Sequence, residues 1–306
     1  MGDATLAAAL ERALGPRRVL ADEPLAAHTT FEVGGPADAF VSARGVEDIR
    51  AAIACAREHN APWHVLGAGS NVLVADEGLR GVCIHIGADM AEVRVEGNEL
   101  VAGAGARNAD VAEAACAAGL SGYEFACGIP GSIGGAAIMN AGAYDGEFKD
   151  VCTSVRCLAL DGSVIEVGSE QASWGYRHSM MMDAGYIVLA ARLVLVPFDR
   201  SRIRARMDEL TAAREAKQPL ELGSAGSTFK RPIGYYAGKL IQDAGMQGHR
   251  VGGAMVSDKH AGFVVNAGGA SAADVRAVIG DVQQAVFADA GVVLEPEVRM
   301  WGFDDE

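Results

Sequence analysis

The sequence predicts a mixed α+β fold in which glycine-rich segments interrupt the regular elements. Short apolar runs at residues 82–86 and 186–196 are typical of buried strands. Apolar residues recur at helical spacing over 46–59 and 271–290, which predicts amphipathic helices. Glycines gather in residues 128–142, where they are too frequent for a stable helix or strand. Helices and strands are therefore expected to alternate, with irregular loops between them.

The first 86 residues predict a β-α-β-β unit. The helix at 46–59 carries its apolar stripe on one face and ends shortly before Pro62. Small residues at 67–71 form a turn between two strands. The elements expected in order are a helix within 1–20, a strand at 25–36, the helix at 46–59, two strands within 63–74 and a strand at 82–86.

The rest of the chain predicts two hairpins, three helices and two strands, with a domain boundary near Pro197. The helix at 271–290 begins with the capping pair Ser271 and Asp274 and ends at Gly291. The elements expected in order are a hairpin at 93–101, a helix at 108–118, a hairpin at 155–167, a strand at 186–196, a helix at 203–217, irregular residues at 220–262, the helix at 271–290 and a strand at 292–301.

The overall composition limits the classes of partner. The chain has 306 residues, enough for two or three domains, and 50% of them are hydrophobic. A formal charge of −14 argues against nucleic acid and against an anionic membrane surface. No stretch has the character of a targeting signal or of a membrane span. None of the six cysteines forms a C-x-x-C pair, so we expect reduced thiols, no metal site and a cytoplasmic location.

Two glycine-rich loops have the character of phosphate-binding loops. Free backbone N–H groups in such loops form concavities that suit a pyrophosphate. The alternative is a set of tight turns between buried strands. Neither loop fits G-x-G-x-x-G, and the nearest match, at Gly103 and Gly105, has Asn108 at the third position. The candidate residues are Gly67, Ala68, Gly69, Ser70 and Asn71 in the first loop, and Gly128, Gly131, Ser132, Gly134, Gly135, Asn140 and Gly142 in the second.

These loops, with residues 29–36 upstream, resemble the FAD domain of the vanillyl-alcohol-oxidase-like flavoproteins. Within that group the chain resembles the UDP-N-acetylenolpyruvoylglucosamine reductase family from about Leu25 to Gly302. The resemblance implies a two-part FAD-binding domain with a smaller α/β substrate-binding domain. The expected units are an FAD-binding subdomain at 1–86, a second at 87–200, the substrate-binding domain at 201–295 and a C-terminal strand at 296–306 that returns to the active site.

The resemblance also implies a reaction, in which NADPH reduces the enolpyruvyl ether of a UDP-sugar with FAD as cofactor, in peptidoglycan precursor synthesis. This chemistry needs a group that stabilises an enolate and a donor that protonates it. We expect FAD to be non-covalent, because a lone His28 beside a turn is more often structural than a tether. No second dinucleotide fingerprint is visible, so NADPH and the UDP-sugar are expected to use one site in turn.

The resemblance assigns three catalytic residues. Ser227, in the segment GSAGSTFKRP, matches the family motif A-G-S-x-F-K and is the expected proton donor. Arg177, in GYRHS, is the expected enolate stabiliser, since a guanidinium stays charged and binds carboxylates through a fixed fork. Glu297 is the glutamate after the proline of LEPEVR. The alternatives are a turn serine, a surface arginine and an edge-strand charge. His178 departs from the Asp or Asn that the family often has there.

A basic patch in this acidic chain is the expected diphosphate site. Between residues 224 and 262 the only acids are Asp243 and Asp258, against five lysines and arginines. The expected substrate-binding residues are Lys217, Lys230, Lys239, Gln242 and His260. Arg231 stands where many relatives have Asn. Arg177 and Ser227 are 50 positions apart, which resembles the shorter form of the enzyme without its tyrosine loop.

Two other functions remain open at this point. A flavin oxidase of the same fold would act on an alcohol or a sugar, and the Ser227 motif with its basic patch argues against it. A non-catalytic protein that binds flavin or UDP-sugar would tolerate replacement of Ser227, Arg177 or Glu297, yet all three are present.

Overall fold

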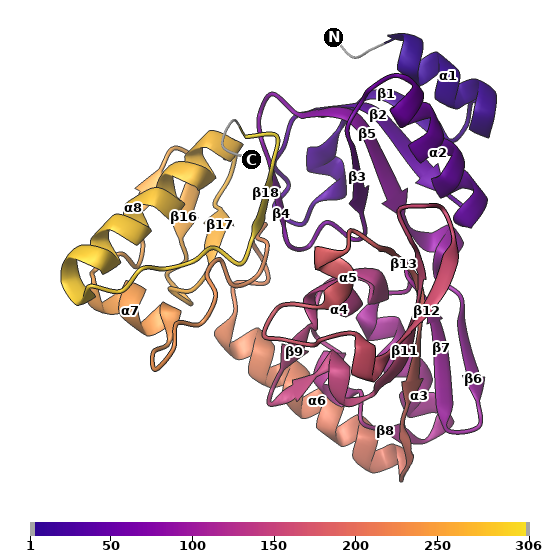
Figure 1. The fold of residues 1–306 in the computed structure, drawn as a ribbon. Helices are drawn as coiled ribbons and strands as arrows, with labels where there is room; N and C mark the ends of the chain where they lie inside the picture. The colour runs from indigo at the N-terminus through magenta and orange to yellow at the C-terminus, as the bar shows by residue number, and fades with distance from the viewer. Residues whose placement is uncertain (1–3, 304–306) are drawn as a thin grey trace.

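A computed structural model describes residues 4–303 of the chain. Its N-terminal part is a four-stranded sheet in the order β1 (Val19–Pro24), β2 (Pro36–Ala43), β5 (Leu79–Ile86), β3 (Trp63–Leu66). β1 runs antiparallel to β2, whereas β2 and β3 both run parallel to β5. Helices α1 (Ala4–Leu14) and α2 (Val46–Glu58) pack on each other and against this sheet (Figure 1).

The next part is an antiparallel five-stranded sheet, in the order β12 (Val164–Gly168), β11 (Cys152–Leu158), β13 (Ile187–Val194), β7 (Glu99–Gly103), β6 (Val93–Glu96). β13 is central, and its residues on both faces are buried or half-buried, which explains its nearly continuous apolar sequence. Helices α3 (Asn108–Ala118), α4 (Ile133–Met139) and α6 (Arg200–Lys217) lie beside it (Figure 1). One hydrophobic core runs through both sheets, so they form a single packed unit.

Shorter elements lie between or beside the strands and helices of these two sheets. They are the strands β4 (Val72–Val74), β8 (Leu120–Ser121), β9 (Gly142–Ala143), β10 (Gly146–Glu147) and β14 (Val196–Pro197), the helix α5 (Met180–Asp183), and the 3₁₀ turns Leu25–His28, Ala88–Met90, Glu124–Ala126, Phe148–Asp150 and Ser169–Gln171.

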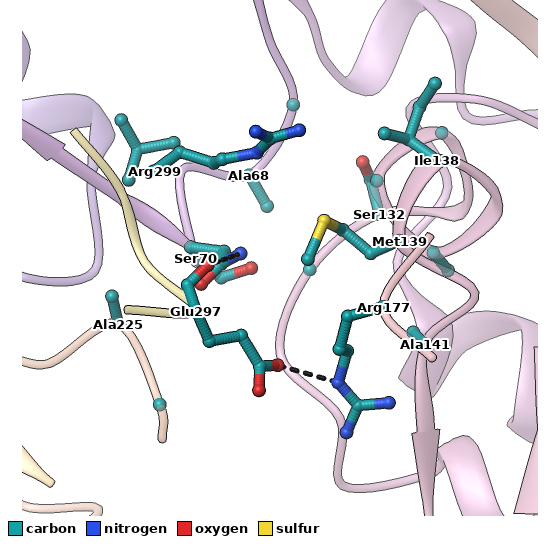
Figure 2. A pocket seen from close by; sticks show the side chains of 18 of the residues that line it. Ala68, Ser70, Ser132, Ile138, Met139, Ala141, Arg177, Ala225, Glu297 and Arg299 are labelled. Atoms are coloured by element: carbon teal, nitrogen blue, oxygen red, sulfur yellow. Dashed lines mark hydrogen bonds and ion pairs between the residues drawn. The ribbon is translucent and has the colours of Figure 1, made fainter. Parts of the chain in front are cut away.

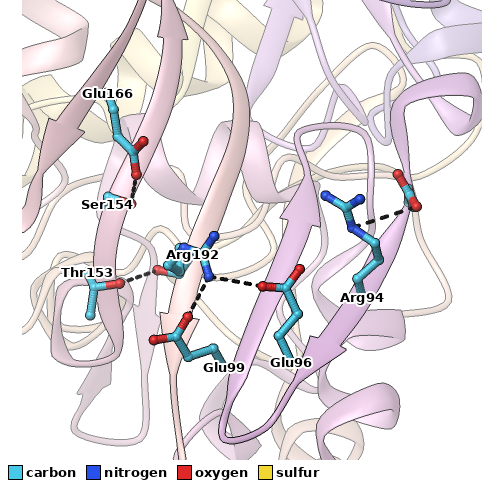
Figure 3. A network of polar contacts seen from close by, with 8 residues as sticks. Arg94, Glu96, Glu99, Thr153, Ser154, Glu166 and Arg192 are labelled. Carbon is cyan, nitrogen blue, oxygen red and sulfur yellow. Dashed lines mark hydrogen bonds and ion pairs between the residues drawn. The ribbon is translucent and has the colours of Figure 1, made fainter.

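A polar network extends across the five-stranded sheet from its central strand β13 to the edge strand β6 (Figure 3). Arg192 of β13 pairs with Glu99 of β7 and, at 3.3 Å, with Glu96 of β6. The Thr153 hydroxyl donates to the Arg192 carbonyl at 3.3 Å. These side chains are partly exposed to solvent, so the network contributes little to stability.

The C-terminal part has its own core. Strands β15 (Arg250–Val251), β16 (Ala254–Val256) and β17 (Val264–Asn266) form an antiparallel sheet. Helix α8 (Ala272–Ala290) covers this sheet, and α7 (Ala237–Asp243) packs on α8. Phe31, Val33 and Leu73 from the N-terminal part belong to this second core. The two parts are therefore joined by buried apolar surface.

Two further contacts tie the C-terminal part to the N-terminal sheet. Strand β18 (Arg299–Trp301) pairs in parallel with β4, as Figure 1 shows beside the label β4. The carboxylate of Asp76 accepts hydrogen bonds from the backbone N–H groups of Ala272 and Ala273, at 2.7 and 2.9 Å. Residues 297–301 thereby reach the first glycine loop.

The structure differs from the sequence-based expectation in four segments. Residues 25–36 form a 3₁₀ turn and a loop instead of a strand, and β2 begins only at Pro36. Within 128–142 a short helix, α4, forms despite its glycines because it packs against β13. Residues 220–262 contain α7, β15 and β16. Of residues 292–301, only the last three form a strand. The segment before them makes only an isolated bridge, between Pro296 and Phe229.

Within the described residues, none of the helices has both the length and the apolar character that crossing a bilayer would require.

Candidate active site

A cleft of about 1010 Å³ lies between the N-terminal and C-terminal parts. Figure 2 shows its lining, with Ala68, Ser70 and Glu297 on one side and Ser132, Met139, Ala141 and Arg177 on the other, and the side chains of Glu297 and Arg177 meet between the two sides. Residues of both glycine loops line it, namely Gly67, Ala68, Gly69, Ser70, Asn71, Gly131, Ser132, Gly134, Gly135 and Gly142.

The two glycine loops touch each other at the cleft wall. A Cβ atom added to Gly67 would lie 2.5 Å from Ser132 Oγ. A Cβ atom added to Gly131, whose φ is +120°, would lie 2.8 Å from Ser70 Oγ. The positive φ favours glycine at position 131, and a side chain at position 67 would displace the Ser132 hydroxyl, so the two loops pack closely through their glycines.

Two residues predicted to bind the cofactor do not line the cleft, and this corrects the prediction. Gly128 packs against α6, where an added Cβ would lie 2.9 Å from Arg214 Cδ. Asn140 is fully buried. Its Nδ2 donates to the Gly175 carbonyl at 2.9 Å, and its Oδ1 accepts from the Lys149 N–H at 3.0 Å. Both residues therefore support the loops around the cleft.

Arg177 lies in a tight turn that points it into the cleft. Gly175 and His178 exchange two backbone hydrogen bonds, at 3.0 and 3.4 Å, around Tyr176 and Arg177. The Arg177 Nε donates to Glu297 Oε1 at 2.7 Å, and an Nη donates to the Gly142 carbonyl at 3.1 Å. The guanidinium is thus fixed on two sides, and its remaining N–H groups are available to a ligand.

Backbone pairing brings Ser227 next to Glu297. The Glu297 N–H donates to the Thr228 carbonyl at 2.8 Å, and the Lys230 N–H donates to the Glu295 carbonyl at 2.9 Å. The Ser227 side chain lies in an exposed position that lines the cleft, and its hydroxyl makes no hydrogen bond within residues 4–303. Ser227 and Glu297, which are 70 positions apart in the chain, therefore place a hydroxyl and a carboxylate at one site.

The Glu297 carboxylate is largely desolvated. Burial raises its pKa above the ordinary value for a glutamate, and the nearby charges of Arg177 and Lys230 only partly oppose this. Glu295, the alternative glutamate, is exposed and pairs with Lys230. The geometry therefore favours Glu297 as the functional carboxylate, as the sequence predicts.

A second cavity of about 430 Å³ opens from the same place. Four residues line both cavities, namely Tyr176, Arg177, Ser227 and Glu297. A ligand in the larger cleft and a ligand in the smaller cavity would therefore meet at the three residues predicted to be catalytic.

The predicted substrate-binding residues lie at different places in the structure. Lys239, Gln242 and His260 line the smaller cavity, and Lys230 lines the larger cleft beside Glu295. Lys217 lies exposed at the end of α6 and lines neither cavity, which corrects its predicted role.

His260 is held as a neutral ring. The Gly262 N–H donates to His260 Nδ1 at 3.0 Å, so the ring proton must be on Nε2. Burial lowers its pKa below the ordinary value for a histidine. His260 therefore offers the smaller cavity a neutral donor, and the cationic groups that line this cavity besides Arg177 are Arg231, Lys239 and Lys259.

Sequence reasoning missed several lining residues. Tyr176 touches both cavities, and the Arg231 guanidinium lies 4.0 Å from the ring centroid of Tyr236, which lines the smaller one. Arg214 and Gln218 of the α6 end line the larger cleft. Tyr176 lies within the GYRHS motif and Arg231 within the basic patch, yet the sequence pattern assigns a role to neither, and it assigns none to Arg214 or Gln218.

The class of protein follows from comparison with known families. The family model "FAD binding domain" matches residues 37–168, which contain both glycine loops, so the fold and cleft are those of an FAD-dependent flavoprotein. The model "UDP-N-acetylenolpyruvoylglucosamine reductase, C-terminal domain" matches residues 218–301.

Full-length relatives define the family. The UDP-N-acetylenolpyruvoylglucosamine reductase of Clostridium beijerinckii is 48% identical over 283 residues, covering 92% of this chain and 93% of the relative. That of Agathobacter rectalis is 50% identical over 296 residues, covering 93% and 94%. The crystal structure of the Thermus caldophilus enzyme has a TM-score of 0.80 at 37% identity, covering 92% and 98%. The chain belongs to the UDP-N-acetylenolpyruvoylglucosamine reductase family.

The larger cleft fits FAD, the cofactor of this family. Its volume of about 1010 Å³ lies at the upper end of the range of about 300–1,000 Å³ for small-molecule sites. The glycines at positions 67 and 131 let the two loops approach each other closely, so that backbone N–H groups of both loops can lie near a diphosphate in the cleft. A buried side-chain oxygen of Gln218 in the cleft makes no hydrogen bond within the described residues and could accept one from a ligand.

Proposed function

We propose that the protein reduces the enolpyruvyl group of UDP-N-acetylenolpyruvoylglucosamine to give UDP-N-acetylmuramate, with FAD as cofactor and NADPH as co-substrate, in peptidoglycan precursor synthesis. The observation that carries this proposal is the meeting of Arg177, Ser227 and Glu297 where the two cavities join. Family membership supplies the identity of the substrate.

The two glycine loops would hold FAD without a covalent bond. Gly67–Asn71 and residues 131–135 offer backbone N–H groups to its diphosphate. When bound, FAD supplies the hydride that NADPH has given it and that the methylene carbon of the substrate receives. All other steps belong to the residues of the chain.

Arg177 would stabilise the negative charge that develops beside the substrate carboxylate. Its guanidinium is already oriented by Glu297 and by the Gly142 carbonyl, so no reorganisation is needed when that charge forms. Glu297 acts here as the group that orients Arg177.

Ser227 would donate the proton that completes the reaction. The carbon beside the substrate carboxylate gains the proton of the Ser227 hydroxyl as the methylene carbon gains hydride, and solvent returns a proton to the serine oxygen. An exposed hydroxyl without a hydrogen-bond partner in the described chain can turn toward the substrate.

The smaller cavity would hold the diphosphate of the UDP-sugar. Arg231, Lys239 and Lys259 supply cationic groups there, in a chain of otherwise acidic composition. Since hydride must be received and delivered beside the same three residues, NADPH and the UDP-sugar would occupy this region in turn. Six free cysteines fit the reducing environment of the cytoplasm, which is the compartment we propose.

The experiment that tests the function uses the purified protein. Acid should release free FAD into the supernatant, and the holoprotein should oxidise NADPH only when the enolpyruvyl substrate is added. A colourless protein that FAD does not reconstitute would contradict the function, whereas flavin retained in the acid precipitate would contradict only its non-covalent binding.

A further inference from the structure

Thr30 joins the first glycine loop to the loop that carries Ser227. Its backbone N–H donates to the Gly69 carbonyl at 3.1 Å, and the Ser224 N–H donates to the Thr30 carbonyl at 2.9 Å. The Thr30 hydroxyl lies 2.6 Å from the Ser224 carbonyl oxygen and 3.5 Å from that of Gly69, so it donates its one proton to Ser224. A single half-buried residue thus contacts the segment proposed to hold FAD and the segment proposed to deliver the proton.

The Ser227 loop is held by different parts of the molecule on its two sides. On one side the adjacent Thr228, which is 1% exposed, belongs with the C-terminal part, because its N–H donates to the Gly262 carbonyl at 2.9 Å. On the other side Ser224 is held by the N-terminal part, through its paired hydrogen bonds with Thr30. The loop therefore spans the junction between the two parts.

The contact with Thr30 influences where the Ser227 loop lies along the cleft. Ala225, which follows Ser224, lines the larger cleft on the same side as Ser70 (Figure 2). Thr30 and Ser224 line neither cavity, so the Thr30 hydroxyl does not reach a ligand there and can act only through the backbone of the loop. A displacement of about 1 Å at a reacting group can slow a reaction about 100-fold.

We propose that Thr30 is a positioning residue for proton transfer, which sets the place of the Ser227 hydroxyl relative to the bound flavin. Its N–H fixes it to the glycine loop, and its hydroxyl fixes the Ser227 loop to it. The proposal rests on the proposed function, in which Ser227 donates the proton.

The variant Thr30→Val tests this proposal, because valine keeps the branched shape and the backbone N–H but lacks the hydroxyl. Thr29→Val is the matched control. The Thr29 hydroxyl also donates to a backbone carbonyl, that of Val33 at 3.0 Å, but this bond stays within one turn. Thr30→Ser restores the hydroxyl. If Thr30→Val does not fold, Thr30→Cys replaces it, because a thiol is a weaker donor.

Four quantities are measured for each variant: the thermal unfolding temperature of the FAD-free protein, the dissociation constant of FAD, and the rates of the two half-reactions. Thr30→Val and Thr29→Val should lose comparable stability, since each loses one hydrogen bond to a carbonyl. Reoxidation of the flavin by the enolpyruvyl substrate should slow about 100-fold in Thr30→Val alone. Its FAD affinity and its reduction by NADPH should stay near the wild-type values, and Thr30→Ser should recover most of the reoxidation rate.

Two further readouts separate positioning from a general structural role. The solvent deuterium isotope effect on reoxidation should increase in Thr30→Val, because a displaced donor makes proton transfer slower. The double variant Thr30→Val with Ser227→Ala should reoxidise no more slowly than Ser227→Ala alone, because Thr30 acts through Ser227.

Three outcomes would overturn the proposal. Equal slowing of reoxidation in Thr29→Val, or additional slowing in the double variant, would make Thr30 a structural residue. Weaker FAD binding with an unchanged reoxidation rate would limit its role to the glycine loop. Failure of the proposed function would be visible separately, as wild-type holoprotein that does not turn over the enolpyruvyl substrate.

Discussion

Arg177 has a φ of 55°, a left-handed backbone conformation that residues other than glycine rarely adopt. Such a conformation costs about 1–3 kcal/mol and persists where the surrounding contacts determine it. Here the two Gly175–His178 hydrogen bonds close the turn, and buried Asn140 holds the Gly175 carbonyl from behind. The strain is therefore maintained at a residue whose side chain faces the proposed reaction site.

Ser227→Ala should separate the two half-reactions, because the serine is needed only when the substrate carbon is protonated. Removing a positioned general acid costs about 10²–10⁴-fold in rate. Flavin reduction by NADPH should stay near the wild-type rate, while reoxidation by the enolpyruvyl substrate slows by that factor. Rapid-mixing absorbance measurements follow each half separately.

Ser224→Ala is the control for this prediction and should change neither half, since Ser224 does not line either cavity. Ser227→Cys should keep part of the activity, because a thiol also donates a proton. Equal slowing of both halves in Ser227→Ala would make the serine structural.

Glu297→Gln should change how stability depends on pH. Burial raises the pKa of Glu297, so the folded protein holds that proton at a pH where the unfolded chain has lost it. With respect to this group, the wild type is therefore most stable below the pKa of the unfolded chain. It loses stability as pH rises through the folded pKa, by about 1.4 kcal/mol for each pH unit that separates the two pKa values. Glutamine does not titrate and should lack this loss.

Denaturant unfolding of the two apoproteins between pH 4 and pH 8 checks this prediction. The free energy of unfolding of Glu297→Gln should rise relative to the wild type as pH increases from the acid end. Parallel curves for the two proteins would show that Glu297 titrates normally in the folded state.

The three proposed catalytic residues could be predicted because each lies in a motif of several residues, and the structure brings them together. The roles of Gly128 and Asn140 could not. A glycine that makes room for an arginine and a glycine that admits a phosphate look the same in a sequence. A buried asparagine that supports a turn also looks the same as one that contacts a ligand. Tertiary contacts alone distinguish these cases.

At the scale of elements, the N-terminus of α8 is where the two parts of the molecule are joined by polar contacts. Asp76 accepts from the N–H groups of Ala272 and Ala273, which have no partner inside the helix, and Ser271 with Asp274 completes the cap. Asp76→Ala should lower the free energy of unfolding by about 1 kcal/mol, as loss of an N-cap does. Chemical denaturation measures this, and the exposed neighbour Glu77→Ala should be silent.

A loss equal to that of Glu77→Ala would mean that solvent satisfies the α8 terminus without Asp76. The substitution should also affect the site, because the contact between Asp76 and α8 helps to position β18 and, with it, residue 297. Weaker FAD binding in Asp76→Ala would therefore accompany the loss of stability.

Long periodic elements could be predicted closely from the sequence, and short ones could not. The helices at 46–58 and 108–118 and both hairpins form at the expected residues because hydrophobic spacing and turn residues define them locally. Helix α4 forms in spite of its glycines because the β13 face covers it, and α7 forms because the α8 face does. Those faces belong to distant residues, so a local pattern does not reveal them.

At the scale of the whole molecule, residues from the N-terminal and C-terminal parts of the chain together form the site. Residues near the C-terminus return to β4, and the Asn71 side chain of the first glycine loop donates to the Glu297 carbonyl at 3.1 Å. The FAD-binding cleft and the smaller cavity consequently share one wall of four residues.

The domain boundaries at 86, 200 and 295 stay predictions, since a core that spans the first two sheets gives no sharp division between them.

The wall that the FAD-binding cleft shares with the smaller cavity leads to a kinetic prediction. If NADPH and the UDP-sugar must both reach the flavin beside Arg177, Ser227 and Glu297, they cannot bind together. Steady-state kinetics should then give parallel lines in double-reciprocal plots, with inhibition by excess UDP-sugar that NADPH relieves.

Substituting Lys259 by alanine, in the smaller cavity, should weaken the inhibition, because the UDP-sugar loses a cation that faces its diphosphate. Exposed Lys217→Ala is the matched control and should leave the inhibition unchanged. Intersecting lines would require a ternary complex, and NADPH would then have to approach the flavin from a part of the cleft that does not include these residues.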